Sequence, residues 1–111
     1  MGTPSILLAG LRLKKILWDN APEEHKLLGP AIEKFCEHAS PQRAPQNAIV
    51  EALSDAFTTH NITVIVHNRE ELDFALGVFA SAIEASDYGR SELHALRCAI
   101  SLYRSRINLL L

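Results

Sequence analysis

Residues 93–110, LHALRCAISLYRSRINLL, carry the clearest periodic pattern of the chain and decide its fold class. Apolar residues recur there at alternating spacings of three and four positions: Leu93, Leu96, Ile100, Tyr103, Ile107 and Leu110. This heptad spacing is typical of a helix with one continuous apolar edge that faces a neighbour. We call these residues the seam, and they predict a long C-terminal helix.

A second apolar row, Ala95, Leu102 and Leu109, lies on another side of the same predicted helix. Apolar surface on two sides needs two neighbours, and a chain of 111 residues offers few. Arg97 and Arg104 flank the seam at positions that commonly set partner choice in helical assemblies. We therefore expect the helix to pack in its own bundle and also to form a homodimer, with the seam and these two arginines as the interface.

The rest of the chain predicts further helices around this one. Apolar residues recur at helical spacing from Pro4 to Trp18, in residues 22–39, in residues 45–57 and in residues 68–85. A turn at residues 87–89 would join the last two helices into a hairpin. We predict one all-α domain over residues 1–111, a four- or five-helix bundle that ends in a long antiparallel helical hairpin.

Local signals refine three boundaries of these helices. Asn20 with Glu23, and Asn68 with Glu71, have the spacing of a capping box at a helix start. Gly29-Pro30 predicts a kink or a restart, because proline lacks a backbone donor and crowds the preceding turn. Residues 62–66, ITVIV, are all β-branched, which favours a short strand unless the surrounding fold imposes a helix.

Residues 47–69 resemble a bacterial helix-turn-helix. Residues 53–57 would end the first helix, residues 58–60 would form the turn, and Thr63-Val64 stand where such motifs often have Thr-Val. The resemblance implies a DNA-binding transcriptional regulator whose contact residues are Asn61, Thr63, His67 and Arg69. Ile65 would project toward DNA where a polar residue is expected, and the net charge of −2 argues against general binding to nucleic acid.

Residues 25–30, HKLLGP, resemble the phospho-acceptor box of sensor histidine kinases. In that box a histidine is followed by a hydrophobic residue two positions on and by proline five positions on. The resemblance implies a histidine phosphotransfer protein with His25 as its acceptor. It covers six residues, and Lys26 stands in place of the usual acid.

The remaining signals point away from catalysis and from metals. His60 and His67 would lie on opposite faces of a strand and about 23 Å apart, so we expect no metal site there. The chain has no glycine-rich phosphate loop, nucleophile elbow or zinc-binding helix motif, so we expect no cofactor and no enzymatic activity. No apolar run reaches the length of a membrane span, so we expect no membrane partner.

Charge and cysteine placement complete the prediction. Residues 1–18 and 88–111 each carry a net charge of +3, and residues 19–87 carry −8, so the ends can pair with the middle in one chain or across a dimer. Cys36 and Cys98 lie in apolar helical patterns, which predicts two buried free thiols in a reducing compartment. We expect a small cytoplasmic protein-interaction or regulatory module without catalysis, with a protein partner that the sequence does not identify.

Overall fold

The computed structural model describes residues 5–39, 45–58, 68–85 and 91–109, and their regular structure is all helical. The helices are α1 (Ile6–Asn20), α2 (Pro22–His38), α3 (Asn47–Thr58), α4 (Arg69–Ala85) and α5 (Ser91–Leu109). The predicted all-α class is confirmed for these residues. The strand considered at residues 62–66 lies outside the described residues.

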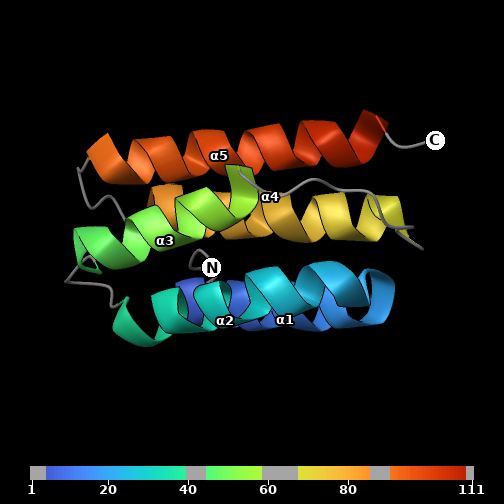
Figure 1. The fold of residues 1–111 in the computed structure, drawn as a ribbon, viewed down its shortest axis with the longest axis horizontal. Helices are drawn as coiled ribbons and strands as arrows, with labels where there is room; N and C mark the ends of the chain where they lie inside the picture. The colour runs from blue at the N-terminus through green and yellow to red at the C-terminus, as the bar shows by residue number, and fades with distance from the viewer. Residues whose placement is uncertain (1–4, 40–44, 59–67, 86–90, 110–111) are drawn as a thin grey trace.

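The helices form a ring in which, among the described residues, each helix packs against two others. The order around the ring is α1, α2, α3, α5, α4 and back to α1. Figure 1 shows α1 and α2 at the bottom, α3 and α4 in the middle and α5 at the top. The extents of 39 × 31 × 20 Å fit a molecule two helices deep, because packed helices lie about 8–10 Å apart.

Apolar side chains from all five helices fill the interior of the ring. The stripe predicted on α4 is buried as expected: Leu72, Ala75, Leu76, Phe79 and Ile83. Phe35 of α2 meets Phe79 edge to face at 6.0 Å between ring centroids, and Phe57 of α3 meets Tyr103 of α5 at 5.3 Å. The first contact joins two helices that are not neighbours in the ring, and the second joins the neighbours α3 and α5.

Hydrogen-bonded caps fix the starts of two helices. Ser5 precedes α1, and its Oγ accepts from the backbone N–H of Leu8 at 3.1 Å. The predicted cap of α4 is confirmed, because Asn68 Oδ1 accepts from the backbone N–H of Glu71 at 3.1 Å. Asn68 Nδ2 in turn donates to Glu71 Oε2 at 3.3 Å.

The predicted start of α2 is wrong. Asn20 is the last residue of α1, and its amide donates to the carbonyl of Ile16 at 3.1 Å and to Glu71 Oε1 at 3.4 Å. Ala21 occupies the N-cap of α2 without a side-chain hydrogen bond. The helix also continues through Pro30 without a restart, because Pro30 lies on the exposed side, where water can satisfy the freed carbonyl.

The basic ends of the chain pair with its acidic middle inside one molecule. Lys14 Nζ of α1 lies 3.1 Å from Glu33 Oε2 of α2. Arg104 Nε of α5 lies 2.9 Å from Asp73 Oδ1 of α4. The intramolecular alternative of the charge prediction therefore accounts for these ion pairs.

Candidate functional site

The seam of α5 faces the interior of its own bundle. Its described members are all buried: Leu93, Leu96, Ile100, Tyr103 and Ile107. Leu110 lies outside the described residues. A second chain cannot reach the buried seam while the bundle is intact, because α5 lies between α3 and α4 in the ring. The interface predicted from these residues therefore requires correction: within one chain they form core.

The two arginines predicted to select a partner also bind within the chain. Arg104 donates from Nε and Nη2 to the two carboxylate oxygens of Asp73, at 2.9 and 3.1 Å. The Asp73 pKa is lowered chiefly by these hydrogen bonds. Arg97 Nη2 lies 4.0 Å from Glu84 Oε1. What α5 leaves exposed is its second apolar row, with Leu102 and Leu109 at 54% and 79% exposure.

A buried polar pair crosses the interior between α2 and α5. Tyr103 Oη donates to Glu24 Oε1 at 2.6 Å, and both side chains are buried. Desolvation, followed by the hydrogen bond to the carboxylate, raises the Tyr103 pKa far above its ordinary value. The phenol therefore stays neutral and donates to the carboxyl. With no exposed edge, this pair stabilises the fold rather than acting on a ligand.

The residues of the two family resemblances are placed as follows. Asn61, Thr63 and His67 of the proposed DNA-contact set lie outside the described residues. Arg69 is the half-buried first residue of α4. Of that set the structure therefore describes Arg69 alone, and the DNA-contact hypothesis stays a prediction.

His25, the candidate phospho-acceptor, is half-buried on α2. Its ring meets the ring of Trp18 edge to face at a centroid distance of 5.1 Å. Its Nε2 also lies only 3.2 Å from the position that a Cβ on Gly29 would occupy. The imidazole therefore lies along its own helix, over Gly29, and does not extend into solvent. Phosphotransfer requires a histidine that does extend into solvent. Trp18 itself is exposed, at 60%.

The two cysteines differ in environment. Cys36 is buried, its Sγ donates to the carbonyl of Ile6 at 3.6 Å, and desolvation raises its pKa to about 11. Cys98 is exposed, which contradicts the prediction of two buried thiols, and its Sγ lies 3.8 Å from His94 Nε2. Across the described ranges, no three histidine, cysteine or acidic side chains gather as metal ligands.

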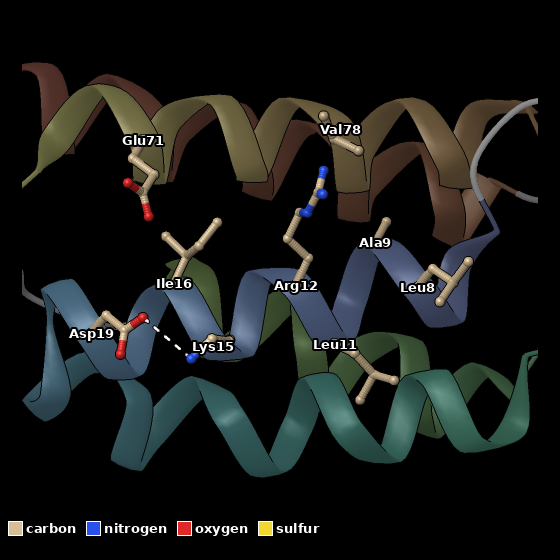
Figure 2. Close-up of a pocket in the computed structure, with 9 residues that line it drawn as sticks. All are labelled: Leu8, Ala9, Leu11, Arg12, Lys15, Ile16, Asp19, Glu71 and Val78. Carbon is tan, nitrogen blue, oxygen red and sulfur yellow. Dashed lines mark ion pairs between the residues drawn. The ribbon is translucent and has the colours of Figure 1, made fainter.

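An open, largely apolar surface lies between α1 and α4. A groove of ≈ 690 Å³ lies there. Figure 2 shows the side chains that line it. Buried Ala9 and half-buried Ile16 line it from α1, and half-buried Val78 lines it from α4. Leu8 and Leu11 stand at its rim with exposures of 66% and 47%.

The apolar surface continues over α4 beyond the groove. A second depression of ≈ 580 Å³ lies between α4 and α5, and Val78 lines both hollows. Phe74 lines the second depression and is 66% exposed. We use the name α1/α4 face for the surface formed by these residues and their charged neighbours: Leu8, Leu11, Arg12, Lys15, Glu70, Glu71, Phe74 and Val78.

The charges of the α1/α4 face are divided between its two helices. Arg12 extends from α1 toward α4 in Figure 2, and it has no ion pair with any described residue. Lys15 contacts Asp19 at 3.7 Å, one turn along α1. Glu70 and Glu71 occupy the first turn of α4. The groove therefore carries Arg12, Lys15 and the acid Asp19 on α1, and the acidic side chains of the face on α4.

The sequence prediction missed this face. A signal for it exists in α1, because Leu7, Leu8 and Leu11 add apolar residues outside the buried stripe of that helix. These residues give α1 a second apolar side, as Ala95, Leu102 and Leu109 do for α5. No helix of the described residues has both the length and the apolarity to cross a bilayer. Comparisons with protein-family models, with curated proteins and with solved structures found no match to this chain.

Proposed function

We propose that this protein is a non-catalytic interaction module that binds another protein chain through its α1/α4 face. One observation carries the proposal: large apolar side chains are exposed at two adjoining hollows. Leu8 and Leu11 lie at the α1/α4 groove, Phe74 lies at the depression between α4 and α5, and Val78 lines both. Contiguous apolar surface of this kind marks interaction sites on soluble proteins. Its burial against a partner contributes about 25 cal/mol per Å² of apolar area removed from water.

A helix suits the groove better than an extended peptide. The residues that line the groove on α1 run from Leu8 to Asp19, which at the helical rise corresponds to about 16 Å. That length accepts about three turns of a partner helix with apolar anchors at three- and four-residue spacing. Recognition by strand addition needs an open sheet edge, and the described residues contain no strand.

Two further points belong to this proposal. We place the protein in the cytoplasm, because Cys36 and Cys98 are free thiols, which suit a reducing compartment. We also interpret α4 and α5 as an antiparallel hairpin, of which α4 forms one side of the face. The cross-pairs Asp73–Arg104 and Glu84–Arg97 support that interpretation, because a later residue of α4 pairs with an earlier residue of α5.

Site-specific photo-crosslinking in the native cells tests the proposal, because it captures a partner whose identity is not known. A photoreactive amino acid replaces Leu11 in one variant, Phe74 in a second and Glu51, exposed on α3, in a control. We expect protein adducts from positions 11 and 74 and none from position 51. Absence of adducts at both test positions, or equal adducts at the control, would rule out the α1/α4 face as a binding surface.

A further inference from the structure

We propose that the segment bound by the groove of the α1/α4 face is an amphipathic helix of another protein that carries an acidic and a basic residue seven positions apart. Apolar residues of that helix lie four positions to either side of its acidic residue. This inference rests on the proposed function and specifies the chemistry of its partner. It follows from the order of charges along the groove.

The antiparallel course of α1 and α4 fixes the height of each residue along the groove. Asn20 Nδ2 of α1 lies 3.4 Å from Glu71 Oε1 of α4, so these two residues stand at one end. Arg12 precedes Asn20 by eight residues, Val78 follows Glu71 by seven, and both line the groove. Arg12 is therefore level with Val78, about 12 Å from the Glu71 end at the helical rise. Figure 2 shows this order, with Val78 across the groove from Arg12 and Glu71 across from Ile16.

The Glu71 end of the groove is acidic. Asp19 lines the groove there from α1, so each helix contributes one acid to this end. Lys15 lies 3.7 Å from Asp19 and offsets one of the two negative charges. Glu71 accepts its hydrogen bonds from the neutral groups of Asn20 and Asn68, which leave its charge in place. A basic residue of a partner therefore fits at this end.

Arg12 supplies the opposite charge further along the groove. It extends toward α4 in Figure 2 and forms no ion pair with a described residue. Arg12 and Asp19 are seven positions apart, which places them on one side of α1 and about 10 Å apart along it. A partner helix that lies along the groove has the same period. An acid over Arg12 therefore places the residue seven positions away over the acidic end, in either direction of the partner chain.

The apolar lining of the groove has the matching spacing. Leu8 lies four residues before Arg12 and Ile16 lies four residues after it, and both line the groove. Residues four positions apart lie on one face of a helix, one turn from each other. A partner helix with apolar residues four positions before and after its acid therefore covers Leu8 and Ile16 while the acid pairs with Arg12.

This order of charges fits a lipid surface less well than a helix. Helices that lie in a membrane interface carry mainly lysine and arginine on their polar side. The groove instead has Asp19 and Glu71 at one end, and Glu70 follows in the same first turn of α4. An anionic bilayer would be repelled by these acids, whereas a helix with one basic residue pairs with them.

Selection from a phage-displayed library of amphipathic helices tests the inference, with the purified full chain as the target. The library fixes leucine four positions before and after a central position. It varies the central position and the positions seven before and seven after it over all residue types. We expect selected helices to carry an acid at the central position and a base at one of the other two. Lysine in place of that acid should weaken binding of a selected peptide about tenfold, because like charges oppose association.

Charge reversal in the target supplies the control. Arg12→Glu should change the preference at the central position from an acid to a base, an effect that a loss of folding would not produce. Lys34→Glu makes the same change at an exposed position of α2 outside the groove and should leave the preference as it is. Leu8→Glu should abolish binding of the selected helices. Circular dichroism of each variant verifies that it folds.

Three results would overturn the inference: selection of no helix, selected helices without the charge pair, or a preference that Arg12→Glu leaves unchanged. Protein adducts from positions 11 and 74 would in each case leave the proposed function standing. A wild-type dimer in light scattering that Leu11→Glu dissociates would place a second copy on the face and exclude a helix of another protein. Absence of both adducts and selected helices would remove the inference and the proposed function together.

Discussion

Replacing Tyr103 by phenylalanine tests the buried pair at the centre of the bundle. The substitution keeps the ring that meets Phe57 and removes only the hydroxyl that donates to Glu24 at 2.6 Å. Glu24 is 1% exposed, so water cannot replace the lost donor without entering the core. The carboxyl retains its other interactions and loses its hydrogen bond from α5.

The expected loss of stability is about 2 kcal/mol, because a hydrogen bond to a charged group contributes about 1.5–3 kcal/mol. For a chain of 111 residues, 1 kcal/mol corresponds to about 4 °C in melting temperature. We therefore expect Tyr103→Phe to lower Tm by about 8 °C, measured by circular dichroism, with a matching shift of the urea midpoint at an unchanged m-value.

A double-mutant cycle with Glu24→Leu isolates the pair from its surroundings. Glu24→Leu alone leaves the Tyr103 hydroxyl buried without its acceptor, whereas the double variant removes both polar groups. The coupling free energy between Tyr103 and Glu24 should exceed about 1 kcal/mol. A Tyr103→Phe effect within about 0.5 kcal/mol of wild type, the range of ordinary surface changes, would refute the reasoning, as would a coupling near zero.

Four further predictions concern two glycines, the buried tyrosine and the thiols. Gly10→Ala should destabilise the protein by about 1–3 kcal/mol in urea unfolding, because its Cβ would overlap Cys36 Sγ. Gly77→Ala, which meets only a movable guanidinium, should be neutral or stabilising by up to about 1 kcal/mol. The free energy of unfolding should fall as pH rises above about 10, because the unfolded chain releases the Tyr103 proton and the folded chain keeps it. Tyr103→Phe should make the free energy of unfolding depend less on pH in this range. An unchanged pH dependence in that variant would contradict the role of Tyr103. A thiol reagent at neutral pH should modify Cys98 quickly and Cys36 only after unfolding, so rapid modification of both would contradict its burial.

Periodicity predicted the helices and most of the core because both depend on local spacing. The stripe of α4 and the cap at Asn68 are read from residues within a few turns of one another. Periodicity did not predict which surface covers the seam. An apolar edge shows that a helix needs a cover, and only the positions of α3 and α4 show that its own chain supplies it.

Other features were not predicted from the sequence, because they depend on distant residues or on a single helical position. Glu24 stands in the first turn of α2, where an acid ordinarily faces solvent, and its burial follows from Tyr103, 79 positions away. Cys98 lies two positions from the buried Ile100, which places it on the exposed side of α5. The α1/α4 face combines residues from two helices that the sequence separates by the whole of α2 and α3.

The ring order has a consequence for how the chain is synthesised. α1 leaves the ribosome before the other four helices, yet one of its two neighbours, α4, follows α2 and α3 and ends only at Ala85. Until then α1 and α2 can pack together while Leu13 and Leu17 lack their later cover. Nascent chains with such uncovered apolar helices are prone to aggregation and are typical clients of chaperones. Exchange of α1 between two incomplete rings would be the corresponding misassembly.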